Sequence, residues 1–229
     1  MVFLQMAALV AFSQDRVLRK AVDVRRLPRE RANEKLAVHL EGIIAYDFTQ
    51  YATPGFIVMD DTGGVYVNAE AEKRWTLGDQ VVITGETEVG NYATVARLKT
   101  LTCIGRGELP HGRRVTAEEI ATGKCDYQRV CVHGVVITTY KDHGDPLWTW
   151  MIVKTETAAV SVALVGSAER EDVLHKYVDA EVDVEGVCIP FCNVRSEFLG
   201  ARITIQDCSA IRVVQPPHDD PFDAPMLET

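Results

Sequence analysis

The chain has 229 residues, a length that is generous for one small β domain and comfortable for two domains of about 100 residues each. Hydrophobic residues make up 47% of the sequence, and only 9 Pro and 16 Gly are present, which excludes low-complexity and collagen-like chains. The formal charge of -9 opposes the electrostatic attraction that supplies most non-specific affinity for nucleic acids, so composition disfavours nucleic acid as a partner.

The N-terminal segment MVFLQMAALVAFS, residues 1–13, is almost entirely apolar. Small residues at Ala11 and Ser13 suit cleavage by signal peptidase, although the basic segment that opens a complete signal peptide is missing. We interpret residues 1–13 as a truncated signal peptide, with a packing or unstructured segment as the alternative. No other stretch approaches the roughly 20 apolar residues of a membrane-spanning helix. We therefore expect a periplasmic or otherwise exported protein, with a cytoplasmic one as the alternative.

Residues 20–110 form the first copy of an internal repeat. The copy opens with a basic pair, then a short helical turn whose first position suits Pro28, then a strand that carries one glycine, Gly42. Alternating apolar and polar residues predict strands at 36–46, 56–60, 64–69, 80–87 and 94–104. A glycine in the middle of a long first strand suits a small barrel, where this strand bends to pair on both sides.

The segment MDDTGG lies between the second and third of these strands and contains Asp-Thr-Gly, the tripeptide around which aspartic proteases build their active site. Such a protease needs two of these aspartates, and the second copy of the repeat reads KTETAAV at this point. Asp, Thr and Gly also supply the side-chain hydrogen bonds and positive φ angles of a tight turn. We therefore interpret Asp61 as part of a hairpin turn and not as a catalyst.

Residues 111–216 form the second copy, in which Thr116 and Glu119 predict a helix capping box. Its strands are predicted at 128–139, 148–154, 157–165, 180–188 and 201–214. An inserted helix is expected within 167–180, with one apolar face formed by Val173, Leu174, Tyr177 and Val178. Five strands with a helix between the third and fourth is the order of the OB-fold. We predict an all-β protein with one or two short helices, built as two tandem five-stranded OB-like barrels and followed by an acidic, Pro-rich tail or linker at 217–229.

The six cysteines contain no C-x2-C pair, so the sequence predicts neither a structural zinc site nor any other metal or cofactor. Disulfides are compatible with an exported chain but are not required by this pattern. Cys103, Cys188 and Cys208 occupy positions of alternating strands where aliphatic residues are usual, so we expect them to be small buried hydrophobic residues.

Candidate ligand-binding residues follow from the OB-fold, which binds across its second and third strands and the loops that flank them. Aromatic rings and amides at these positions suit sugars or unpaired bases, with core or loop packing as the alternative in both copies. The second copy is the better candidate, because Trp148 and Trp150 are two residues apart and share one face of a strand. The candidates are Tyr51, Phe56, Tyr66, Asn68 and Tyr92 in the first copy and Lys141, His143, Trp148, Trp150, Phe191, Asn193 and Arg195 in the second.

Catalysis is not expected from this sequence. The loop KDHGDP places His143 between two aspartates, a combination that can bind metal or move protons, but its Gly and Pro indicate a hairpin loop and no nucleophile motif accompanies it. His133 falls on the outward phase of a strand, where histidines are usually solvated or at an interface. We therefore predict a non-enzymatic protein.

Several segments resemble a known family: VHLEGIIAYDF, GFIVMDDTGGVYVN, LGDQVVITGETEVGNYATVARLKTLTCIGRGELP and VEGVCIPFCNVRSEFLGARITIQDCSAIRVV. They resemble the tandem OB-like extracytoplasmic regions of large bacterial sensor histidine kinases, over about residues 22–225. The resemblance implies a periplasmic sensory or binding module of a two-component system, with an envelope ligand or protein partner and a kinase transmitter in cis or in trans. The alternatives are an OB-fold protein that binds single-stranded nucleic acid or oligosaccharide, and a structural spacer without a ligand.

Overall fold

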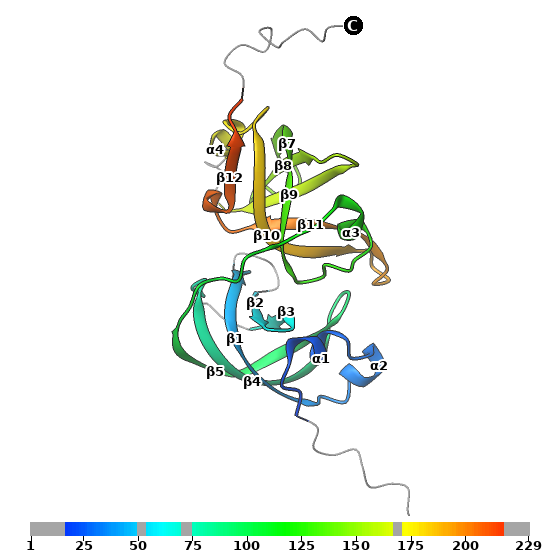
Figure 1. Cartoon of the computed structure of the whole chain (residues 1–229). Helices are drawn as coiled ribbons and strands as arrows, with labels where there is room; N and C mark the ends of the chain where they lie inside the picture. Colours follow the sequence, from blue (N-terminus) through cyan, green and yellow to red (C-terminus); the bar gives the residue numbers. More distant parts are fainter. Residues whose placement is uncertain (1–16, 50–53, 70–74, 167–170, 218–229) are drawn as a thin grey trace, which may run out of the picture.

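The computed structural model describes residues 17–49, 54–69, 75–166 and 171–217 (Figure 1). It is built mostly of β-strands in two barrels that follow each other along the chain and pack together (Figure 1). The proposed signal peptide and the C-terminal tail from residue 218 onward lie outside the described residues. No helix within the described part of the chain is long and apolar enough to cross a membrane.

The first barrel is preceded by two short helices that lie against it, α1 (Ala21–Arg25) and α2 (Arg29–Ala32). Its five strands close in the order β1-β2-β3-β5-β4, because β4 pairs back with β1. They are β1 (Ala37–Asp47), β2 (Gly55–Asp60), β3 (Gly63–Asn68), β4 (Asp79–Val89) and β5 (Thr94–Arg106). The pairing of β3 with β5 is parallel and the others are antiparallel, as an OB barrel requires.

The second barrel repeats this order as β7-β8-β9-β11-β10 and closes through the pairing of β10 with β7. Its barrel strands are β7 (Arg129–Lys141), β8 (Trp148–Lys154), β9 (Ala159–Val165), β10 (Glu181–Cys192) and β11 (Phe198–Ile205). Two further strands extend this sheet, β6 (Arg113–Arg114) beside β7 and β12 (Ile211–Gln215) beside β10. The short helices here are α3 (Ala117–Ala121), α4 (Glu171–His175) and the 3-10 turn η2 (Cys208–Ala210). The predicted pair of OB-like barrels is confirmed.

Some local predictions hold and others are wrong. The capping box forms, since the Thr116 hydroxyl accepts from the Glu119 backbone N–H and the Glu119 carboxylate accepts from the Thr116 N–H. The predicted strand at 201–214 is in fact two strands, because the Asp207 side chain caps a 3-10 turn after Ile205 and β12 then pairs with the start of β10.

The apolar face expected on the inserted helix is only partly correct. Leu174 and Tyr177 are buried in the second barrel's core and Val178 packs against it, whereas Val173 is exposed. Among the cysteines, Cys188 is buried as expected. The expectation for the others was wrong: Cys103 lies on the exposed outer face of β5, and Cys208 is half-buried in the 3-10 turn. No disulfide joins any of the six cysteines, all of which lie in the described part of the chain.

Each barrel has its own core, and a third apolar cluster joins the two barrels. This interbarrel cluster combines Tyr46, Phe48, Ile57 and Met59 of the first barrel with Tyr127, Val187 and Ile189 of the second. A hydrogen bond also crosses the contact, from the Asp47 backbone N–H to Oε1 of Gln206 at 3.1 Å. Burial of aromatic and aliphatic side chains on this scale stabilises the contact, so the barrels form one packed unit.

The MDDTGG segment is the tight turn between β2 and β3, since Asp60 pairs directly with Gly63 across the hairpin. Asp60 is its structural carboxylate: Oδ1 accepts from the Thr62 backbone N–H at 2.7 Å, and Oδ2 accepts from the first N–H of α1, that of Ala21, at 2.8 Å. Asp61 is exposed and forms an ion pair with Lys20 at 2.5 Å. Its interpretation as a turn residue is confirmed.

The glycine after this turn allows the barrels to approach closely. A Cβ atom on Gly64 would lie 2.1 Å from the carbonyl oxygen of Tyr127 in the second barrel. The Arg25 guanidinium of α1 donates to the Gly64 carbonyl on the same side. Asp126, the neighbour of Tyr127, is buried here, and its Oδ1 has no hydrogen-bond partner among the described residues. Burial raises the pKa of the Asp126 carboxyl to about 7, an effect that the positive charge of Arg25 partly offsets.

Candidate ligand-binding face of the second barrel

Four aromatic side chains gather on the outer face of the second barrel. Trp148 and Trp150 come from the outward phase of β8, because the residues that alternate with them, Thr149 and Met151, are buried. Their ring centroids are 5.5 Å apart with the planes inclined by 14°. Tyr140 of β7 is the cross-strand partner of Trp150 and stacks on it at 6.5 Å and 21°. Three nearly parallel rings thus stand in a row; Phe191, from the end of β10, lies 6.3 Å from Trp150.

Arg202 of β11 binds to this aromatic row from one side. Its guanidinium carbon lies 4.5 Å from the ring centroid of Trp148 and 4.5 Å from that of Phe191. Arg202 is buried, so its charge acts on these rings with little solvent screening. The guanidinium therefore holds two aromatic side chains of different strands in fixed positions and adds a cation to the face.

The loop between β7 and β8 fixes the two indoles. Trp148 Nε1 donates to Asp145 Oδ2 at 3.0 Å, and Trp150 Nε1 donates to Asp142 Oδ2 at 3.2 Å. Asp142 Oδ1 in turn accepts from the backbone N–H groups of Gly144 and Asp145, and these bonds, with that from Trp150, hold the pKa of the Asp142 carboxyl below its ordinary value. The aspartates of KDHGDP thus orient the tryptophans, and the rings are rigid before any ligand arrives.

The opposite loop, between β10 and β11, is held by Asn193. Its Oδ1 accepts from the backbone N–H groups of Arg195 and Glu197, and its Nδ2 donates to Glu197 Oε2 at 2.6 Å. Asn193 therefore shapes the loop and does not project its amide toward a ligand. His143 and Arg195 are exposed at the loop tips, and Lys141 is half-buried at the end of β7.

The face between these loops is open and apolar. Tyr140 is 45% exposed and Phe191 is 36% exposed, and the aliphatic residues Leu147 and Leu199 beside them are exposed as well. The structure thus brings together Trp148, Trp150 and Phe191, as predicted from their positions. It adds Tyr140 and Arg202, which sequence reasoning missed. Tyr140 could have been found as the residue opposite Trp150 if the strand predicted at 128–139 had been extended by one residue.

The first barrel offers no equivalent face within the part of the chain that the structure describes. Phe56 is fully buried and packs on Trp75 at 4.6 Å, which corrects the expectation that it lies on a surface. Tyr66 packs edge-on against Phe48 at 5.4 Å, within reach of Tyr127 of the second barrel.

The other described candidates of the first barrel also contact residues of the protein itself. Tyr92 contacts Phe198 of the second barrel at 5.4 Å, so this ring contributes to the contact between the barrels. The Asn68 amide donates to Glu88 Oε2 at 2.9 Å, beside the ion pair of Glu88 with Arg97. Tyr51 lies outside the described residues. Among the described residues, the aromatic rings that are exposed, Tyr140 and Phe191, both belong to the second barrel.

Comparison with known proteins gives likenesses to solved structures only. No protein-family model and no curated protein matches the chain. A murine DNA-binding protein bound to double-stranded DNA matches with 9% identity and a TM-score of 0.39, over 80% of this chain and 98% of that one. Fission yeast Pot1 with single-stranded DNA matches with 11% identity and a TM-score of 0.38, over 88% and 89%.

A third likeness is to the asparaginyl-tRNA synthetase of Pyrococcus horikoshii, with 18% identity and a TM-score of 0.36 over 47% of this chain. The chain spans about a quarter of the length of that synthetase, 24%. These TM-scores are low, so the fold assignment rests on the strand pairing given above, which closes both barrels in OB order.

Proposed function

We propose that this protein is a non-enzymatic binding module whose second barrel binds single-stranded nucleic acid by stacking unpaired bases on its aromatic face. The observation that supports this most is the row of Tyr140, Trp150 and Trp148, three nearly parallel rings on the OB surface. Base stacking on such rings contributes about 1–3 kcal/mol per base and tolerates any sequence. A row of rings suits successive bases of one strand.

The charges around the face are of both signs, and the chain as a whole is acidic. Arg202 places a positive charge 4.5 Å from the Trp148 ring centroid, and Lys141 at the end of β7 and Arg195 in the β10–β11 loop carry positive charge in the flanking segments. The two nearby aspartates accept hydrogen bonds from the indoles, and thus lie at the ring edges. Composition disfavoured nucleic acid because it averages over the whole surface. With few cations at the face, binding should depend mainly on stacking and only weakly on salt.

The test is fluorescence anisotropy with a labelled single-stranded oligonucleotide of about 16 nucleotides, which covers the site sizes of OB-folds. We expect saturable binding by the whole chain and a loss of at least about tenfold in affinity for Trp150→Ala, from the loss of one stacking ring. The matched control is Ile104→Ala, which removes an exposed apolar side chain from β5 of the first barrel and should bind normally.

Two outcomes would refute the proposal. One is the absence of saturable oligonucleotide binding by the folded wild-type chain. The other is Trp150-dependent binding of an oligosaccharide such as a chitin fragment in place of the oligonucleotide, which would assign the same rings to sugars. The periplasmic sensor role implied by the resemblance to histidine kinases stays a prediction about where such a module operates.

A further inference from the structure

A cleft of about 540 Å³ opens on the second barrel, away from the aromatic face. Its walls come from the chain before β6 and from β6, β7, β10, η2 and β12, and they share no residue with the aromatic row. Leu109, Cys131 and Ala210 provide apolar surface in it. Three arginines and His111 line the cleft together with only two carboxylates, although the whole chain carries a charge of -9.

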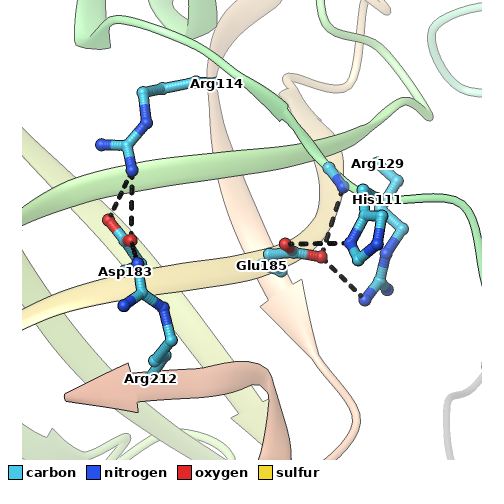
Figure 2. A network of polar contacts seen from close by, with 7 residues as sticks. His111, Arg114, Arg129, Asp183, Glu185 and Arg212 are labelled. Carbon is cyan, nitrogen blue, oxygen red and sulfur yellow. Dashed lines mark hydrogen bonds and ion pairs between the residues drawn. The ribbon is translucent and has the colours of Figure 1, made fainter. Parts of the chain in front are cut away.

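Asp183 lies at the floor of this cleft, with a side chain that is 6% exposed (Figure 2). Arg114 Nη2 donates to both carboxylate oxygens, at 3.0 and 3.1 Å, and Arg212 Nη2 donates to Oδ2. Nδ1 of His133 lies 2.9 Å from Oδ1. Because β12 pairs with one edge of β10 and β7, which carries β6 on its far side, pairs with the other, one buried carboxylate holds two guanidinium groups that come from opposite sides of β10.

Glu185, two residues farther along β10, is the second carboxylate of the cleft. It accepts from Arg129 Nη2 at 3.3 Å and from the Gly112 backbone N–H at 3.2 Å, and His111 lies 3.9 Å away (Figure 2). The Nε donor of Arg129 is buried and has no acceptor among the described residues, which adds positive potential beneath the cleft.

The exposed fractions of the side chains show which charged groups a ligand in the cleft can contact. The side chains of Arg114 and Arg212 are 60% and 70% exposed, against 6% for the Asp183 side chain between them. The carboxylate therefore lies beneath the guanidinium groups and orients them, as supporting residues do in built anion sites. Each of the two arginines uses only Nη2 in these bonds, so the remaining donors of its planar fork can serve a ligand.

We propose that this cleft binds an organic phosphate monoester. Its phosphate group would lie between Arg114 and Arg212, because two guanidinium groups offer enough donors for three terminal phosphate oxygens. Its organic part would contact Leu109 and Ala210, since a space of about 540 Å³ is far larger than a phosphate ion and falls in the range of small-molecule sites. The site does not depend on the function proposed for the aromatic face.

The test is isothermal titration calorimetry of the whole chain with phenyl phosphate, with phenol and inorganic phosphate as separate probes. We expect saturable binding of phenyl phosphate, weaker binding of inorganic phosphate and none of phenol. Arg212→Gln and Arg114→Gln should each weaken phenyl phosphate binding by about tenfold or more, the effect of losing a charge-assisted hydrogen bond. Arg31→Gln, which removes an exposed arginine paired with Glu34 on α2, is the matched control and should bind normally.

Four results would overturn the proposal, of which the first three come from the calorimetry. They are an absence of phenyl phosphate binding at millimolar concentration, equal binding of phenol, and unchanged affinity in both cleft variants. Circular dichroism of each variant establishes that the fold is retained, which we expect because both arginine side chains are more than half exposed. An oligonucleotide that competes with phenyl phosphate would also overturn it, by assigning the cleft to nucleic-acid backbone.

Discussion

The contact between the barrels makes the stability of the protein depend on pH through Asp126. Its carboxyl is buried between the barrels with Arg25 as the opposite charge, and its pKa is raised to about 7 from the ordinary value of 3.8. A raised carboxyl pKa means that the folded protein binds this proton more tightly than the unfolded chain. The stabilisation is therefore fully present below about pH 4 and is lost as the pH rises through about 7.

The magnitude follows from the two pKa values. A difference between 3.8 and about 7, at about 1.4 kcal/mol for each pH unit, gives about 4 kcal/mol of stability that is lost between pH 4 and pH 8. Asp126→Asn keeps the shape of the side chain and cannot ionise. Wild type should lose this stability between pH 4 and pH 8, and the variant should not. The difference in the free energy of unfolding, variant minus wild type, should therefore be about 4 kcal/mol larger at pH 8 than at pH 4.

Urea unfolding of both proteins at pH 4 and pH 8, followed by tryptophan fluorescence and circular dichroism, measures this double difference. The control is Asp61→Asn, because Lys20 holds the pKa of the exposed Asp61 carboxyl below its ordinary value. Asp61→Asn should be slightly less stable than wild type at neutral pH. Its difference from wild type should therefore change with pH in the opposite direction to that of Asp126→Asn. The reasoning is wrong if Asp126→Asn shifts the double difference by less than about 1 kcal/mol or reverses its sign.

Two further predictions concern stability. Gly64→Ala should cost about 1–3 kcal/mol, because the added Cβ meets the Tyr127 carbonyl oxygen at 2.1 Å, whereas Gly105→Ala, whose Cβ meets only the flexible end of Gln80, should cost less in the same urea assay. Thr116→Ala should lower the free energy of unfolding by about 1 kcal/mol through loss of the capping box, and an unchanged melting temperature would contradict this role.

Alternation of apolar and polar residues, repeated along the chain, was enough to predict both barrels and most of their strands. Features that depend on a few neighbouring residues could be predicted equally well, such as the hairpin turn at Asp61 and the shared face of Trp148 and Trp150. These patterns succeed because a strand or a turn is specified mostly by residues close together in sequence.

Residues whose role depends on contacts between distant segments could not be predicted from such local patterns. The aromatic candidates of the first barrel were predicted from the same strands and loops of the OB-fold as those of the second, yet Tyr66 and Tyr92 pack toward or against the second barrel. Arg202 looked like an ordinary strand residue until β11 placed it over Trp148. Nothing local distinguishes a ring that faces solvent from a ring that faces another barrel.

The sequence by itself therefore determined the class of fold, the repeat and the strand that carries the tryptophans. Only the tertiary structure showed that the described aromatic rings of the first barrel are packed inside the protein, and only the pairing of β10 with β7 and β12 brought Arg114, Asp183 and Arg212 into one cleft. The physical reason is that burial and charge pairing are set by which surfaces meet. That choice is made when barrels close and pack, over separations along the chain that no local periodicity records.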